Sequence, residues 1–317
     1  MTFSSKYLEG SDNGKNTGAD RSQQTWKYAG EAYLNFNKTI AKDHSLNAMV
    51  GSSFEVSNQL EYNIAGSFFL SEDIHYMNLA TVKDVKNIYT SGWDEAMVGV
   101  FGRVVYSWKS RYTITGNLRF DGSSRFGKNN RYATFPSFSL GWRLNRENFM
   151  QNLSWIDDLK VRGSWGQTGN QEISNIARYT IYVPNYGVTE SGGQSYGTSY
   201  DIAGTNGGSI LQSGFKRNQI GNDNIKWETT TQVNLGLDFS LLKQSLYGSF
   251  DWFYKKTTDI LVQMAGIAAM GEGSSQWINA GEMKNVGVEL NLGYRNQTAF
   301  GLKYDLNANI ATYRNEI

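Results

Sequence analysis

The fold is indicated by one stretch of the sequence, Tyr112-Thr-Ile-Thr-Gly-Asn-Leu-Arg-Phe-Asp121. Apolar side chains and one glycine occupy its even positions, whereas threonine, asparagine, arginine and aspartate fill the odd ones. Because successive side chains of a β-strand point to opposite faces, this alternation predicts a strand with one apolar and one polar face. The segments 46–56 and 132–144 alternate in the same way.

Further alternating segments bring the total to about ten predicted strands. The additional segments cover residues 24–37, 97–108, 159–165, 233–241, 245–256, 288–295 and 302–310. The predicted strands run for roughly 9 to 14 residues, whereas strands of soluble proteins usually have about five or six. Eleven residues tilted by about 45° cover roughly 25 Å, which is the height of the apolar band of an outer-membrane barrel. The sequence therefore predicts an all-β protein, an antiparallel transmembrane β-barrel.

The connections between these strands alternate in length. Short ones are expected at 38–44, 109–110, 242–244 and 296–300, and long ones at 57–96, 121–131, 167–226 and 257–285. A barrel with short periplasmic turns and long extracellular loops has this asymmetry. The segment 145–158 is an exception among the short ends, and there we predict a small periplasmic turn helix, capped by Asn145 and containing Glu147.

The composition excludes several other classes of protein. The chain has 317 residues, a net charge of +1, no cysteine, 34 glycines and only two prolines. It contains no apolar run long enough for a transmembrane helix, and its first residues do not resemble a signal peptide. The near-zero net charge gives no reason to expect nucleic acid as a partner.

Several motifs occur together in a fixed order. They are Asn117-Leu-Arg-Phe-Asp-Gly-Ser-Ser-Arg-Phe-Gly127, Phe135-Pro-Ser-Phe-Ser-Leu-Gly-Trp-Arg143, Trp155-Ile-Asp-Asp-Leu-Lys-Val-Arg-Gly-Ser-Trp-Gly-Gln-Thr-Gly-Asn170, Trp227-Glu-Thr229, Asp251-Trp-Phe-Tyr-Lys255 and Asn279-Ala-Gly-Glu-Met-Lys-Asn-Val-Gly-Val-Glu289. In these motifs the chain resembles the SusC/RagA-like, TonB-linked outer-membrane transporters of the Bacteroidota, and the resemblance runs across most of its length.

The resemblance implies a plugged barrel of the 22-stranded type, a size class in which the lumen is closed by a plug. It also implies import of glycans or peptides across the cell outer membrane, with a SusD-like surface lipoprotein and the TonB complex as partners. Residues 1–317 would then be a partial barrel domain. The signal peptide, N-terminal extension, TonB box, plug and C-terminal strands of the family are expected to lie outside it, which makes the chain an internal fragment.

The polar face of the strands carries charges that we expect to face the lumen. Some of them, together with loop tyrosines able to stack on sugar rings, are candidates for the substrate path. These candidates are Arg103, Arg119, Arg143, Lys160, Arg162, Asp238, Asp251, Glu289, Tyr179, Tyr182, Tyr186, Tyr196 and Tyr200. The alternative interpretation is that the charges solvate the lumen and pair with each other or with a plug.

No catalytic residue, cofactor or metal is predicted. His44 is expected to be solvated in a short turn, and His75, beside Glu72 and Asp73, lacks the spacing of a calcium loop. The segment 121–124, Asp-Gly-Ser-Ser, has no histidine partner. It is predicted to be a turn in which the aspartate and serine side chains hydrogen-bond the backbone and Gly122 supplies a positive φ. The glycine-rich segment 166–170 is read as the exit from a strand.

Three other functions remain open. A passive porin or a barrel adhesin would need no plug and no energy coupling. A soluble glycan-binding protein would expose an apolar belt larger than a soluble surface tolerates. An outer-membrane barrel enzyme is the least favoured, since no active-site set is present.

Overall fold

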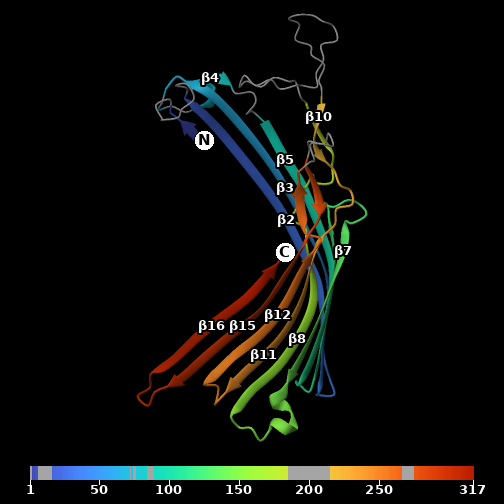
Figure 1. Ribbon diagram of the computed structural model, residues 1–317, viewed down its shortest axis with the longest axis vertical. Helices are drawn as coiled ribbons and strands as arrows, with labels where there is room; N and C mark the ends of the chain where they lie inside the picture. Colours follow the sequence, from blue (N-terminus) through green and yellow to red (C-terminus); the bar gives the residue numbers. More distant parts are fainter. Residues whose placement is uncertain are drawn as a thin grey trace, which may run out of the picture. The chain divides into compact units, whose positions relative to one another are not determined.

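The computed structural model describes residues 2–5, 16–71, 73, 76–83, 89–184, 215–265 and 275–317. Its main sheet contains ten long antiparallel strands, in agreement with the predicted number (Figure 1). They are β2 (Thr17–Ile40), β3 (His44–Phe69), β5 (Tyr89–Trp108), β6 (Tyr112–Ser123), β7 (Tyr132–Arg143), β8 (Ile156–Asn170), β11 (Glu228–Leu241), β12 (Leu246–Thr258), β15 (Glu282–Gln297) and β16 (Lys303–Glu316). Two short strands, β1 (Thr2–Ser4) and β4 (Ala80–Lys83), pair with β2 and β3 respectively.

Most of the long strands extend beyond the predicted segments, and three of them reach 20 residues or more. β2, β3 and β5 have 24, 26 and 20 residues. The expected long loop at 57–96 was therefore wrong in part, because β3 continues to Phe69 and β5 already begins at Tyr89. Asn58 interrupts the apolar row after Val56, but the alternation then resumes, with Leu60, Tyr62 and Ile64 on one face and polar residues on the other.

The chain divides into two compact units, one of residues Met1–Gly30 and Phe54–Met97 and the other of Glu31–Ser53 and Val98–Ile317. The first unit is held by buried polar contacts. The side chain of Asn16 donates to the Phe69 carbonyl and accepts from the Phe69 amide, at 3.0 and 2.6 Å. Glu61 accepts hydrogen bonds from Arg21 at 2.7 Å and from the Tyr89 hydroxyl at 3.0 Å.

In the second unit the strands are joined at one end by short turns, as predicted (Figure 1). Three of them pass through the left-handed region of φ without using glycine. Their residues with positive φ are Ala41, Lys42, Lys109, Ser110, Leu242, Lys243 and Gln244. The tight left-handed turn suits the twist of paired antiparallel strands, so these connections fix the register of the long hairpins.

The connection between β7 and β8 contains two short 3-10 helices, η4 (Leu144–Arg146) and η5 (Asn148–Met150). A small helical turn was predicted here, but its capping was not as expected. Asn145 lies inside η4 and donates its side-chain amide to the carbonyl of Asp157, at 2.9 Å. Glu147 lies between the two helices and faces the ends of the strands.

The expected long loops at 167–226 and 257–285 contain a second sheet. Its order is β13 (Leu261–Met264), β14 (Ser275–Asn279), β10 (Phe215–Ile220) and β9 (Ile181–Pro184). β10 and β14 pair in parallel, which departs from the wholly antiparallel prediction. These four strands are short and carry no extended alternation, so hydrophobic periodicity could not predict them.

The tightest core of the second unit lies where its longer connections meet. Its large buried side chains come from segments that are far apart in the sequence, and they are Phe126, Phe135, Ile173, Ile225 and Trp227. The ring centroids of Phe126 and Trp227 are 5.0 Å apart. Arg125 donates to the carbonyls of Gln171 and Ile173, at 3.2 and 3.0 Å.

The segment 121–124 leads from β6 into the connection that carries Phe126. The prediction that it is a turn was wrong. Asp121, Gly122 and Ser123 belong to β6, and Gly122 is not among the residues with positive φ. A side chain at Gly122 would instead meet the ring of Tyr132, 2.4 Å away. The predicted bond from serine to the backbone is present, since the Ser123 hydroxyl accepts from the Arg125 amide at 3.2 Å.

Among the described residues no helix is long and apolar enough to cross a membrane.

Candidate functional site

The strands of the second unit have two chemically different faces. One row across β7, β8 and β11 pairs Leu140 with Gly163 and Gly163 with Leu235, and both leucines are about half exposed. One residue further along, the row on the opposite face pairs Gly141, Arg162 and Gly236. The alternation seen in the sequence thus separates an apolar face from a polar one, as an outer-membrane barrel requires.

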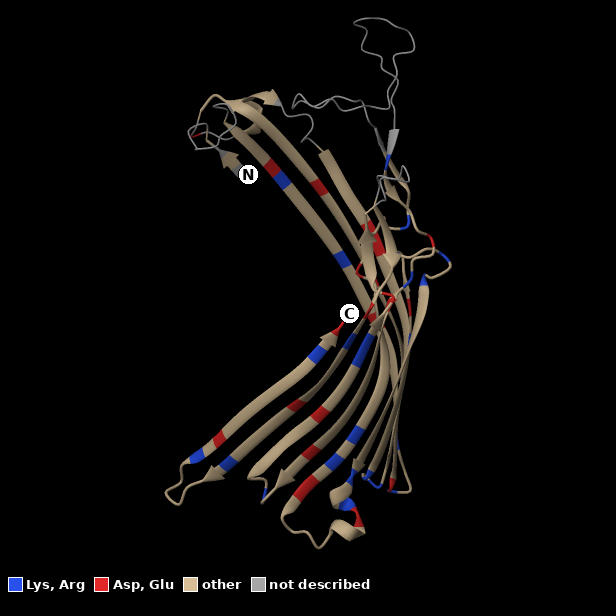
Figure 2. Cartoon of the chain, viewed as in Figure 1, with Lys and Arg blue, Asp and Glu red and all other residues tan. Residues whose placement is uncertain are grey.

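Charged side chains on the polar face form a strip across β8, β11 and β12 (Figure 2). Arg162 on β8 lies 3.2 Å from Asp238 on β11 and 2.7 Å from Asp251 on β12. Lys160, directly opposite Asp238 in the ladder, lies 3.7 Å from it. The structure therefore brings together four of the predicted site residues, which we call the charged strip: Lys160, Arg162, Asp238 and Asp251.

Gly236 makes the contact between Arg162 and Asp251 possible, which reaches across β11. It lies between Arg162 and Asp251 in the ladder, and a Cβ at this position would be 2.6 Å from Cζ of Arg162 and 2.7 Å from Oδ1 of Asp251. The guanidinium therefore occupies the space that any other side chain would fill. Sequence reasoning missed Gly236, because an isolated glycine in a strand does not show which side chain passes over it.

Two further predicted residues flank the strip without joining it. Arg143 on β7 is paired in register with Lys160, and Glu289 on β15 is paired with Asp251. Within the described part of the chain neither side chain forms an ion pair. Uncompensated positive charge thus lies at the β7 side of the strip and negative charge at its β15 side.

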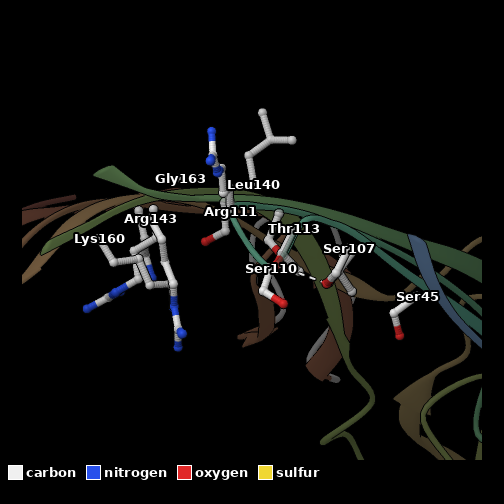
Figure 3. Close-up of a pocket in the computed structure, with 15 residues that line it drawn as sticks. Ser45, Ser107, Ser110, Arg111, Thr113, Leu140, Arg143, Lys160 and Gly163 are labelled. Atoms are coloured by element: carbon white, nitrogen blue, oxygen red, sulfur yellow. Dashed lines mark hydrogen bonds between the residues drawn. The ribbon is translucent and has the colours of Figure 1, made fainter. Parts of the chain in front are cut away.

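A hollow of about 580 Å³ lies beside the β7 side of the strip. Arg143 and Lys160 point to the same side of the sheet there, opposite to Leu140 (Figure 3). Hydroxyl groups supply much of the remaining lining, from Ser45, Ser107, Ser110, Thr113, Thr115, Ser139 and Ser164. Cations among hydroxyl donors give a hydrophilic wall that can hydrogen-bond anionic or hydroxylated groups.

The remaining candidates lie elsewhere. Arg119 is held on its own strand by Asp121, at 2.7 Å, and reaches the Ser53 hydroxyl at 3.3 Å. Arg103 is exposed on β5 and is not brought to the strip. Tyr179 and Tyr182 are 50% and 60% exposed, and Tyr179 contacts the Arg178 guanidinium, 4.5 Å from its ring centroid. Tyr186, Tyr196, Tyr200 and His75 lie outside the described residues.

A second cluster lies at the turn end of β5, β6 and β7. Trp108 stacks on Tyr112 and Tyr112 on Trp142, with centroids 5.5 and 6.2 Å apart. Glu147 accepts hydrogen bonds from Tyr112 at 2.6 Å and from Trp142 at 3.1 Å, and it pairs with Arg111 at 3.1 Å. These contacts, led by the Tyr112 hydrogen bond, lower the pKa of the Glu147 carboxyl below its ordinary value of 4.5.

His44 belongs to the same cluster, and its predicted solvation was wrong. Its Nδ1 lies 2.6 Å from the Tyr106 hydroxyl, and its ring stacks near Trp108 with centroids 6.4 Å apart. Pairing of β3 with β5 brings these residues together, although they are about sixty positions apart in the sequence. Among the described residues no group of histidine, aspartate and glutamate is arranged to hold a metal ion.

The family model for the TonB dependent receptor-like β-barrel matches residues 2–317. The chain belongs to this family. It is accordingly a β-barrel protein of the outer membrane, and the predicted SusC/RagA-like identity is confirmed.

Curated relatives include TonB-dependent receptors. The chain is 33% identical to TonB-dependent receptor P39 of Formosa agariphila over 93% of its own length and 27% of the relative's. It is 36% identical to TonB-dependent receptor SusC of Bacteroides thetaiotaomicron over 70% of its own length and 21% of the relative's. The chain therefore spans about a quarter of the length of these relatives.

Solved structures show the same fold. The RagAB peptide transporter superposes with a TM-score of 0.81 at 24% identity, over 96% of this chain and 32% of the other. The outer membrane transporter YddB from Escherichia coli superposes with a TM-score of 0.58 at 9% identity, over 93% of this chain and 34% of the other. At these sequence identities the structural similarity shows only that the chain shares the barrel fold of these proteins.

Proposed function

We propose that this segment forms part of the wall of a TonB-dependent outer-membrane importer of glycans or peptides, and that it has no enzymatic role. The observation that carries the proposal is the division of one sheet into an apolar face and a hydrophilic face with the charged strip. Such a wall separates lipid from a polar lumen. The RagAB peptide transporter and the outer membrane transporter YddB share this fold, and the curated relatives are TonB-dependent receptors, which supports the same conclusion.

The partners in this proposal are a SusD-like surface lipoprotein at the outer mouth and the TonB complex on the periplasmic side. The lipoprotein would meet the end of the second unit that holds the buried core around Phe126 and Trp227, since this end lies opposite the short turns. A core that ties several connections together gives a partner a fixed surface on which to dock. Outer-membrane lipid covers the apolar face.

For the substrate path we propose the hollow beside Arg143 and Lys160, together with the charged strip. Arg143 and Glu289 flank the charged strip and form no ion pair with any of the described residues, so they can bind substrate without first breaking one. The exposed rings of Tyr179 and Tyr182 are proposed as stacking surfaces nearer the outer mouth. Arg103 and Arg119 remain candidates by position, although Arg119 is already paired.

Uptake measurements test the proposal. The full-length gene that carries this segment is deleted and restored in its host, and uptake of labelled oligosaccharides and peptides is measured with and without a protonophore. We expect uptake that needs both the gene and the energised inner membrane. Gene-dependent uptake that persists with the protonophore would instead identify a passive porin, and gene-independent uptake with loss of cell attachment would identify an adhesin.

The substrate path has its own test. Arg143→Gln and Glu289→Gln are expected to raise the apparent KM for uptake while the amount of receptor in the outer membrane stays the same. Lys303→Gln, at an exposed lysine at the start of β16 and beside a short turn, is the matched control. Equal uptake in all variants would remove the two residues from the path and leave the importer proposal intact.

A further inference from the structure

The short turns of the second unit carry an excess of positive charge. Their cations are Lys42, Lys109, Arg111, Arg146 and Lys243, and their only carboxylates are Asp43 and Glu147. Arg111 is paired with Glu147, and Lys109 lies 3.9 Å from Asp43. Lys42 and Lys243 lie within ion-pair distance of no carboxylate in the described part of the chain.

The three lysines occupy backbone positions where lysine is not the usual residue. Lys42, Lys109 and Lys243 have φ values of 61°, 51° and 58°, in the left-handed region. Glycine and asparagine adopt this conformation more readily and are the usual residues of such hairpin turns. Each of the three turns instead places one lysine there. Backbone geometry does not account for that choice, whereas a requirement for positive charge at this end does.

Apolar side chains surround the lysines. Leu242, next to Lys243, is 53% exposed, and Lys109 Nζ lies 5.5 Å from the Trp108 ring centroid. Phe149 and Trp155, in the connection between η4 and β8, are also largely exposed. Exposed aromatic and aliphatic groups beside flexible cations are typical of surfaces at the boundary between acyl chains and headgroups.

We propose that Lys42, Lys109 and Lys243 bind the phosphate groups of phospholipids in the periplasmic leaflet, with Leu242, Phe149 and Trp155 inserted beside them. The lysine stems extend along the apolar surface, and the ammonium groups reach the headgroups. The orientation rests on the proposed function, in which the short turns face the periplasm. The lipid contact itself does not depend on what the protein transports.

The proposal is tested on the full-length protein, folded in detergent and placed in nanodiscs. One set contains phosphatidylcholine alone, and the other contains phosphatidylcholine with phosphatidylglycerol. Enrichment of phosphatidylglycerol around the protein is measured by native mass spectrometry. The variant is Lys42→Asn/Lys109→Asn/Lys243→Asn, which keeps a residue suited to positive φ and removes the charge together with the aliphatic stem. Lys128→Asn, at the opposite end of the unit, is the matched control.

We expect the triple variant to bind phosphatidylglycerol more weakly by roughly fivefold per lysine, and on the order of a hundredfold in all, with the difference shrinking as salt rises. Lys128→Asn is expected to leave binding unchanged. Equal enrichment in the wild type and the triple variant overturns the proposal and points to an acidic periplasmic protein as the partner. An equal loss in Lys128→Asn overturns it as well, because the effect would then be one of net charge. Lipid binding without uptake activity would contradict only the proposed import.

Discussion

The guanidinium of Arg162 on β8 crosses β11 to reach Asp251 on β12, with Nη2 2.7 Å from Oδ2. It passes over Gly236, where a Cβ would lie 2.6 Å from Cζ of the arginine. On its way it also contacts Asp238, so one side chain connects three strands. The charges on the polar face thus form a single network, and its geometry depends on the absence of a side chain at Gly236.

Replacement of Gly236 by alanine is expected to displace the flexible end of Arg162 from Asp251 and to destabilise the folded protein by about 1 kcal/mol at most, which is the contribution expected from a partly exposed ion pair. Urea unfolding in lipid vesicles, followed by tryptophan fluorescence, measures the change. Gly116→Ala is the matched control, because a Cβ at Gly116 meets no atom within 4 Å. Equal stability of the two variants would show that Arg162 finds another path to Asp251.

The pair itself is measured by a double-mutant cycle with Arg162→Met and Asp251→Asn. Because the side chains are 33% and 21% exposed, solvent screens their attraction, and we expect a coupling free energy of only about 1 kcal/mol. Asp238→Asn is expected to couple to Arg162→Met as well, since Asp238 also contacts the guanidinium at 3.2 Å. Strictly additive effects of the single changes would mean that the contact contributes nothing to stability.

The sequence was sufficient to predict the parts of the fold in which apolar and polar side chains alternate with a period of two. Each of the ten predicted segments coincides with a long strand, and the residues assigned to the polar face of β8, β11 and β12 form the charged strip. Alternation is a local property of the chain, so it can be read without knowing which strands are neighbours. The assignment of charges to one face followed directly from it.

The contacts that the sequence did not show depend on long-range pairing. His44 meets Tyr106 only because β3 and β5 are neighbours, and Phe126 meets Trp227 only because two connections fold onto each other. The role of Gly122 was also misread, because a close approach of the Tyr132 ring leaves no trace in the local pattern. Packing partners and close approaches are properties of the folded sheet.

The connection between η4 and β8 is expected to respond to acid. The folded-state pKa of Glu147 is lowered below 4.5, so its contribution to stability is complete above that value and is lost as the pH falls through the lowered pKa. The protection factors of the amides of residues 144–156 against hydrogen exchange, which are corrected for the intrinsic effect of pH on the exchange rate, should therefore fall at low pH. Glu147→Gln should lower these protection factors at neutral pH and remove their dependence on pH. Glu172→Gln is the control, because the Glu172 side chain is 82% exposed. If Glu147→Gln responded to acid in the same way as the wild type, the Glu147 carboxyl would be excluded as the source of the response.

The core around Phe126 is expected to hold the connections at the end opposite the short turns. The side chain is fully buried against Trp227, so Phe126→Ala leaves a cavity and should cost about 3–5 kcal/mol. Because Phe135 is the one large buried side chain of this core that comes from a long strand, limited proteolysis should cut within residues 124–131 and 171–184 before it cuts the short turns. Phe300→Ala, at a ring that is 80% exposed, should change stability by no more than about 0.5 kcal/mol. Cleavage at the short turns first, or an equal loss of stability in both variants, would show that the core does not organise this end of the protein.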